Sequence, residues 1–118
     1  MTIQNALASV AVKDLGAAAI WYEKVLGRPA DSKPMPEVHE WQFERGGWLQ
    51  VYELPERAGN CSFTLAVSRL DDEVARLSRM GIDTRARTSG AKASTLMITD
   101  PDGNHIAFAE AGDPTMAR

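Results

Sequence analysis

The end of the chain shows the clearest alternation of apolar and polar positions. After the sequence Asp-Pro-Asp-Gly-Asn at residues 100–104, Ile106 and Phe108 fall on one face, and His105 and Ala107 on the other. Such a period of two is typical of a strand with one face against an apolar layer. The segment before it predicts a turn, because its proline presets φ and its glycine accepts a positive φ.

Apolar positions recur at three- and four-residue spacing in two segments, which predicts two helices. The first is expected over residues 15–26, with Asp14 as its N-cap and Gly27 in the left-handed position that ends it. The second is expected over residues 70–80 and ends at Gly81. We expect the buried stripes to consist of Leu15, Ala18, Ala19, Tyr22, Val25 and Leu26 in the first helix, and of Leu70, Val74, Leu77 and Met80 in the second.

Further strands are predicted at residues 5–12, 28–32, 38–44, 48–53, 61–67, 82–86 and 93–99. The segment 33–36 is expected to be a loop, because its two prolines cannot donate to a ladder. Residues 54–60 are expected to link two halves, and a polar tail is expected from Asp113 onward.

The two halves repeat one pattern. Residues 46–53 align with residues 103–110, and residues 12–15 align with residues 67–70, a period of roughly 55 residues. The repeat predicts one module over about residues 5–54 and a second over about residues 60–111, packed into a single domain that spans residues 1–118.

The segment from Leu15 through Trp21-Tyr22-Glu23-Lys24-Val25-Leu26-Gly27, together with the final Asp-Pro-Asp-Gly-Asn strand, resembles the vicinal oxygen chelate superfamily. This superfamily includes glyoxalase I, the bleomycin-resistance proteins and the extradiol dioxygenases. The resemblance covers nearly the whole chain. It implies an α+β fold of two βαβββ modules, whose curled mixed sheets enclose a cavity, and a homodimer.

Composition and net charge limit the kinds of binding partner that the protein can have. The 118 residues are 44% hydrophobic and 25% charged, as in an ordinary globular protein, and the net charge of −3 offers no electrostatic footprint for nucleic acid or an anionic membrane surface. No apolar run approaches the roughly 20 residues of a membrane helix, and no signal peptide is recognisable. Cys61 is the only cysteine and cannot form an internal disulfide. We therefore expect a cytoplasmic protein.

The resemblance also implies four metal-ligand positions, two in each module, that hold His, Glu or Gln in metal-dependent members. They fall on Leu7, Gln50, Ser62 and Ala107. Only the amide of Gln50 could bind a metal, whereas a catalytic zinc keeps about three protein ligands. A register slip of two residues adds one strong ligand, His105. We therefore expect no metal and no other cofactor.

Strand parity places Trp48, Gln50 and Tyr52 on one face. Apolar walls with a few hydroxyl and amide groups suit a flat, partly aromatic organic ligand. The predicted ligand-binding residues are Leu7, Ser9, Trp48, Gln50, Tyr52, Ser62, Thr64, Met97, His105 and Ala107. Trp41 would join them if its strand faces the cavity, which the pattern leaves open. The alternative is that Trp48 and Tyr52 belong to the core or to a dimer contact.

The remaining polar residues give weaker indications of a functional site. Glu53 and Glu110 occupy equivalent strand ends and are expected to be surface carboxylates rather than an acid–base pair. Basic residues at 85, 87 and 92 surround the loop 88–91, which is expected to be solvated, with an anionic ligand as the alternative. His39 is expected to be a surface or partly satisfied histidine. No catalytic Ser-His-Asp or Cys-His order is visible.

Three functions follow from these expectations. The first is a metal-independent small-molecule binding protein that resembles the bleomycin-resistance proteins and sequesters an antibiotic or an aromatic metabolite. The second is a metal-dependent lyase, isomerase or dioxygenase of the same superfamily. The third is a structural or regulatory domain that has kept the fold and lost the site.

Overall fold

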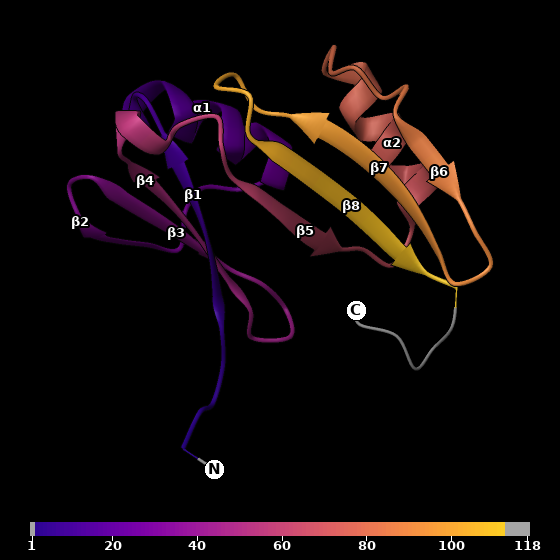
Figure 1. Ribbon diagram of the computed structural model, residues 1–118, viewed down its shortest axis with the longest axis horizontal. Coiled ribbons are helices and arrows are strands. Elements are labelled where there is room, and N and C mark those ends of the chain that lie inside the picture. The colour runs from indigo at the N-terminus through magenta and orange to yellow at the C-terminus, as the bar shows by residue number, and fades with distance from the viewer. Residues whose placement is uncertain (1, 113–118) are drawn as a thin grey trace. The chain divides into compact units, whose positions relative to one another are not determined.

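The computed structural model describes residues 2–112, which form two modules with one helix and one four-stranded mixed sheet each (Figure 1). The α+β class expected from the sequence is confirmed. In chain order the elements are β1 (Leu7–Val12), α1 (Leu15–Leu26), β2 (Ser32–Met35), β3 (Val38–Gln42), β4 (Trp48–Glu53), a 3-10 helix (Pro55–Arg57), β5 (Ser62–Ala66), α2 (Leu70–Arg79), β6 (Arg87–Ser89), β7 (Ala93–Thr99) and β8 (His105–Ala111). Within residues 2–112 the helices α1 and α2, with 12 and 10 residues, are too short to span a bilayer.

The first compact unit comprises residues 2–61 together with residues 101–104. Its sheet has the strand order β1-β4-β3-β2, in which β1 pairs with β4 in parallel and the other neighbours are antiparallel. The helix α1 packs on one face, where the ring centroids of Tyr22 and Trp41 lie 6.4 Å apart. The buried residues on this side of the sheet and on α1 are Val10, Val12, Leu15, Ala18, Tyr22, Val25, Trp41, Leu49 and Val51.

The second unit comprises residues 62–100 and 105–112 and repeats the arrangement. Its strand order is β5-β8-β7-β6, with β5 parallel to β8, and α2 packs against β7 and β8. The buried residues of the sheet and of α2 are Phe63, Leu70, Leu77, Leu96, Ile98, Ile106 and Phe108. Phe63, Ile106 and Phe108 alternate with the small residues of the opposite face, as the sequence pattern predicted.

Each helix begins at a carboxylate from the last strand of its own module. The Oε1 atom of Glu53 accepts a hydrogen bond of 3.0 Å from the backbone N–H of Leu15, and Oε1 of Glu110 accepts one of 2.7 Å from Leu70. The N-cap of α1 predicted at Asp14 is confirmed, and Gly27 ends the helix with φ of 84°. The two glutamates therefore satisfy helix N–H groups, a role that the sequence analysis did not assign to them.

The turn at residues 101–104 is fixed by Asn104, which is fully buried. Its Oδ1 accepts hydrogen bonds from the N–H groups of Gly59 (2.9 Å) and Cys61 (3.0 Å), and its Nδ2 donates to the carbonyl of Ala11 (2.8 Å). Gly59 has φ of 87°, and a Cβ there would lie 2.6 Å from the carbonyl oxygen of Asp102. This close approach of two loops therefore requires glycine.

The prediction of a strand over 28–32 and a loop over 33–36 is wrong, because β2 runs from Ser32 to Met35. Pro34 is tolerated there because β2 is an edge strand with a register shift against β3. The predicted strand over 82–86 is also wrong, since the strand begins at Arg87. Asp83 instead accepts a hydrogen bond from the backbone N–H of Arg85, which favours a local turn over a ladder.

Smaller differences concern the ends of elements, among them β3, which ends at Gln42, and β5, which spans Ser62–Ala66. The first strand begins at Leu7 rather than Asn5, whose side chain instead donates to the carbonyl of Gly46. The helix α2 ends at Arg79, and Met80 is 39% exposed rather than part of the buried stripe. The polar tail expected from Asp113 onward lies outside the described residues.

Candidate functional site

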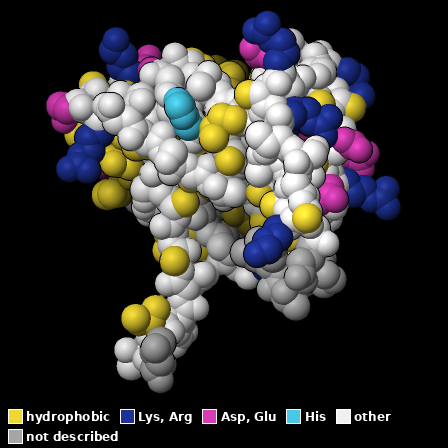
Figure 2. Space-filling model, turned by 45° about the vertical axis from the view of Figure 1, so that its right-hand side comes forward, with side chains coloured by type: hydrophobic (Ala, Val, Ile, Leu, Met, Phe, Trp, Pro, Cys, Tyr) yellow, Lys and Arg dark blue, Asp and Glu magenta, His cyan; other side chains and the backbone are white. Residues whose placement is uncertain are grey.

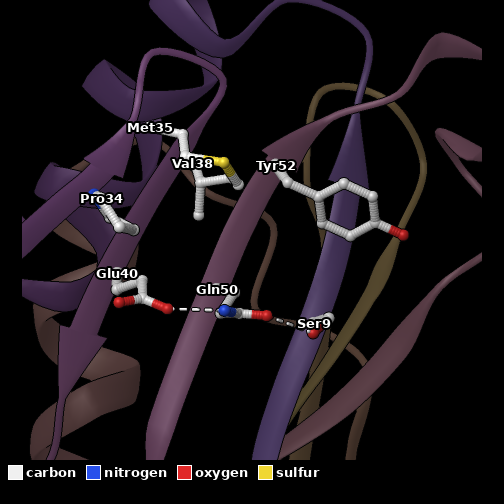
Figure 3. Close-up of a pocket in the computed structure, with 7 residues that line it drawn as sticks. All are labelled: Ser9, Pro34, Met35, Val38, Glu40, Gln50 and Tyr52. Carbon is white, nitrogen blue, oxygen red and sulfur yellow. Dashed lines mark hydrogen bonds between the residues drawn. The ribbon is translucent and has the colours of Figure 1, made fainter.

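A cavity of about 530 Å³ lies in the first unit, on the sheet face opposite α1 (Figure 3). Its volume is within the range of about 300–1,000 Å³ that is usual for small-molecule sites. Strand β4 shows why the face is available: Leu49 and Val51 are buried on the helix side, while Gln50 and Tyr52 point the other way. The lining residues are Ser9, Pro34, Met35, Val38, Glu40, Gln50 and Tyr52.

The polar part of the cavity is a chain of hydrogen bonds across three neighbouring strands. Ser9 on β1 donates from Oγ to Oε1 of Gln50 on β4 over 3.0 Å, and Nε2 of Gln50 donates to Oε2 of Glu40 on β3 over 2.6 Å. The three residues lie directly opposite one another in the strand register. Because a carboxylate only accepts hydrogen bonds, Glu40 fixes the orientation of the Gln50 amide.

The apolar part comes from Pro34 and Met35 on the edge strand β2, from Val38 on β3 and from the ring of Tyr52 on β4. Met35 is 51% exposed, whereas Val38 is buried, so the wall runs from an open rim to a closed floor. Figure 3 shows the Tyr52 ring extending toward β1, beside the hydrogen-bonded chain. A guest would thus meet hydrocarbon and an aromatic face on one side and polar atoms on the other.

Three of the predicted residues, Ser9, Gln50 and Tyr52, line this cavity. Leu7 and Trp48 lie on the same face of the sheet as these three residues. They form a pair of opposite residues one step further along the strands and do not line the cavity. The sequence analysis missed Pro34, Met35, Val38 and Glu40. Pairing residues 38–42 against 48–53 as an antiparallel hairpin would have found Glu40, because that register sets it opposite Gln50.

The facing of β3, which the sequence left open, is settled by its partners. Trp41 and His39 lie on the α1 side, with their ring centroids 6.4 Å apart, and the indole Nε1 of Trp41 donates to the carbonyl of Arg28 over 2.9 Å. Trp41 is therefore a core residue and does not line the cavity. Burial lowers the pKa of His39 below its usual value, and the positive charge of Lys33 lowers it further.

The other predicted site residues, Ser62, Thr64, Met97, His105 and Ala107, share one face of the sheet in the second unit. Ser62 lies opposite His105, and Ala107 lies between Thr64 and Met97. Ile106 and Phe108 are buried on the other face. Within this unit the shared face carries the imidazole of His105 among short or flexible side chains, in contrast to the larger polar side chains of β3 and β4.

The predicted basic region near residues 85–92 is largely balanced by acidic partners. Arg85 forms a 2.9 Å ion pair with Asp83, and Arg87 forms a 2.9 Å ion pair with Asp71. Hydrogen bonds from Arg85 lower the pKa of Asp83 to about 2. On the face shown in Figure 2, basic and acidic side chains lie interspersed. These arginines therefore give the loop little positive charge with which to hold an anion.

The side chains present do not fit a catalytic metal. Among residues 2–112 no group of three or more His, Cys, Asp and Glu side chains is placed to hold a metal ion. The cavity of the first unit offers one carboxylate, Glu40, and the amide of Gln50 is engaged on both its oxygen and its nitrogen. At the corresponding position of the second module, Ala107 has no donor atom. One carboxylate and one amide that is already engaged fall short of the roughly three protein ligands that a catalytic zinc keeps.

Comparison with known proteins gives one family match and several similar solved structures. Residues 8–109 match the glyoxalase-like domain. A glyoxalase/bleomycin resistance protein from Catenulispora acidiphila shares 36% sequence identity and a TM-score of 0.83, over 92% of this chain and 99% of that one. No functionally curated protein matches the chain in sequence.

Two more distant structures share the fold. TnmS3, an antibiotic binding protein from a Streptomyces species, is 23% identical with a TM-score of 0.80, over 94% of this chain and 98% of that one. A lactoylglutathione lyase from Agrobacterium tumefaciens is 16% identical with a TM-score of 0.79, over 98% of both chains. The match over residues 8–109 and the repeated module together show that the chain belongs to the glyoxalase-like domain family of the vicinal oxygen chelate superfamily.

Proposed function

We propose that this protein binds a flat, partly aromatic organic molecule in the cavity of its first unit and does so without a metal. The observation that carries the proposal is the state of Gln50, the residue at the position where metal-dependent relatives hold a ligand. Its amide oxygen accepts from Ser9 and its amide nitrogen donates to Glu40, so both ends of the side chain are engaged within the protein.

The cavity supplies the two components that small-molecule sites combine. Pro34, Met35, Val38 and Tyr52 offer apolar surface, which contributes roughly 25 cal/mol for each Å² removed from water. The polar chain gives direction, because a ligand group must match fixed acceptors and donors. Two relatives support sequestration as the role: one is a glyoxalase/bleomycin resistance protein and the other an antibiotic binding protein. Sequestering an antibiotic or an aromatic metabolite would require no further chemistry.

Tryptophan fluorescence offers the direct test. Trp48 lies on the cavity face, one pair along the sheet from Gln50, so its emission should change when a guest enters. A panel of flat aromatic antibiotics and metabolites would be titrated by fluorescence and by calorimetry, with W48F to identify the signal. Saturable binding of at least one member at one site per chain is expected. Absence of saturable binding across a broad panel would overturn the proposal.

A matched pair of methionine variants places the site. Met35 lines the cavity and Met80 is exposed at the end of α2, so each loses the same atoms on mutation to alanine. M35A should weaken binding about fivefold, since roughly 0.8 kcal/mol is lost for each buried CH₂ and the side chain is half exposed. M80A should leave the affinity unchanged. Equal effects of the two variants would place the site elsewhere.

The second candidate is a metal-dependent lyase, isomerase or dioxygenase. One observation favours it: Glu40 brings a carboxylate within 2.6 Å of the Gln50 amide, so the cavity does hold two oxygen-bearing side chains side by side. Elemental analysis of the purified protein separates the two candidates. Near-stoichiometric nickel, zinc, iron or manganese that is lost in E40Q would favour the enzyme.

A further inference from the structure

Glu40 brings a negative charge into an otherwise neutral cavity. Of the seven lining side chains it is the only carboxylate, and none of the others is basic. Ion pairs between described residues join Arg28 to Asp31, Arg76 to Glu73, Arg85 to Asp83 and Arg87 to Asp71, and none includes Glu40. Lys33, on the neighbouring strand β2, forms no ion pair with it either. Among the side chains of residues 2–112, the carboxylate is met by the neutral amide of Gln50 alone.

The carboxylate also keeps capacity to accept further hydrogen bonds. Gln50 donates to Oε2, and Figure 3 shows the other oxygen of Glu40 directed away from Gln50. A carboxylate has about four lone-pair positions, all of them acceptors. A ligand group that meets Glu40 must therefore donate hydrogen bonds. An ammonium group does so with up to three N–H donors and adds a charge-assisted contact.

A neutral guest would be penalised at the same place. Covering Glu40 removes water from the carboxylate, and a charge that is desolvated without a partner is strongly unfavourable. An anionic guest would add like-charge repulsion. Tyr52 lies diagonally across the strand pair from Glu40 on the same face, and an aromatic ring also attracts cations. Glu40 and Tyr52 thus favour the same kind of guest.

We propose that the ligand of this cavity is an organic cation whose ammonium group pairs with Glu40, and that Glu40 determines this specificity. The proposal rests on the proposed function, because it assumes that the cavity binds a small molecule. Gln50, whose amide oxygen accepts from Ser9, holds the carboxylate in place. Pro34, Met35 and Val38 receive the hydrocarbon part of the guest.

The test uses the full chain and two probes that differ in one terminal group. These are 2-(1-naphthyl)ethylamine, which is cationic at neutral pH, and the neutral 2-(1-naphthyl)ethanol, each titrated by calorimetry at low salt. The amine is expected to bind at least about tenfold more tightly, which corresponds to about 1.4 kcal/mol. E40Q should remove this preference, because its amide oxygen can still accept from Gln50 while the charge is gone. E40D should retain part of it.

Glu37 provides the matched control. It is exposed, lies one residue before β3 and does not line the cavity, so E37Q removes the same charge nearby. E37Q should change the affinity for the amine by less than about twofold, as expected for a screened surface charge. If E37Q weakens binding of the amine as much as E40Q does, the preference arises from the overall negative charge of this part of the protein, and the proposal is overturned.

The remaining outcomes separate the two proposals. If wild-type protein binds amine and alcohol equally and M35A weakens both, the cavity binds small molecules but Glu40 does not select cations. If neither probe binds saturably while members of the aromatic panel do, the proposed cation preference is overturned, but the proposed binding function stands. If no compound of either set binds, both proposals fail. Thermal unfolding of E40Q and E40D, expected close to wild type, would show that any loss is not a loss of folding.

Discussion

The side-chain amide of Gln50 donates a hydrogen bond of 2.6 Å to the carboxylate of Glu40 across the β3–β4 pair. This contact makes Glu40 an acceptor in the cavity wall and turns the amide oxygen toward Ser9. The position at which the family resemblance implies a metal ligand belongs here to a polar network that joins Ser9, Gln50 and Glu40. The arrangement predicts how the site responds to a change of charge.

Replacing Gln50 by glutamate should destabilise the fold at neutral pH, because two carboxylates would face each other at hydrogen-bonding distance. Q50E is expected to lower the free energy of unfolding by about 1–2 kcal/mol at pH 7, and the loss should shrink as the pH falls and the pair takes up a proton. Urea unfolding at pH 7 and pH 5 measures both effects. The neutral control Q50M should lose about 1 kcal/mol at either pH. Equal losses at both pH values in Q50E would contradict this account.

Asn104 should be the most sensitive polar residue of the turn, because its side chain satisfies three backbone groups. N104A would leave the N–H groups of Gly59 and Cys61 and the carbonyl of Ala11 without this partner. A loss of about 3 kcal/mol in the free energy of unfolding is expected. N104D should cost at least as much, since a carboxylate would face the Ala11 carbonyl.

Urea or thermal unfolding of both Asn104 variants tests this prediction. The exposed Asn60 offers a control, since within the described part of the chain its side chain bonds just the nearby carbonyl of Ala58, over 3.4 Å. N60A should change the stability by less than about 0.5 kcal/mol. An N104A protein as stable as N60A would show that the buried network does not hold the turn.

The glutamates that begin the two helices should contribute equally and independently. E53A removes the acceptor of the Leu15 N–H, and E110A removes that of Leu70. Each should cost about 1 kcal/mol, the usual effect of losing a helix cap or a favourable charge at a helix N-terminus. The double variant should lose the sum, because each carboxylate serves its own helix. Chemical denaturation of the set checks this, and a single variant of wild-type stability would refute the capping role.

The pH dependence of stability should contain a contribution from His39. Burial, and next the charge of Lys33, lower its pKa in the folded state below the usual 6.5. The unfolded chain therefore takes up the proton first as the pH falls. The stabilising contribution of neutral His39 is fully present above about pH 6.5. It is lost as the pH falls from about 6.5 to below the lowered pKa of the folded state. Unfolding between pH 8 and pH 5 should show a smaller decline for H39Q than for wild type. An identical decline in the two proteins would contradict the assignment.

The parts of the fold that the sequence predicted best are those with a strong local pattern. The strands at 48–53 and 93–99 have the expected bounds, because their alternation continues to a turn at each end. The helix over 15–26 is also confirmed, since Asp14 and Gly27 mark its ends. The repeat extended these elements to a two-module architecture, which the family match and the solved relatives support.

The candidate site was harder to predict because it depends on pairing between strands. In β3 both Val38 and Trp41 are buried, on opposite faces, so burial pattern alone cannot say which way Glu40 points. In β2, Pro34 suggested a loop, although an edge strand can accept a proline. Parity along β1 and β4 did find Ser9, Gln50 and Tyr52, but it could not say that Leu7 and Trp48 lie beyond the cavity.

The most direct test of a metal-free binding site is one calorimetric comparison. Protein dialysed against EDTA would be titrated with the tightest-binding member of the aromatic panel, and again after equimolar zinc, nickel, iron or manganese is added back. The structure predicts the same dissociation constant, within about twofold, in every titration. Binding that disappears with EDTA and returns with one of these metals would contradict the account.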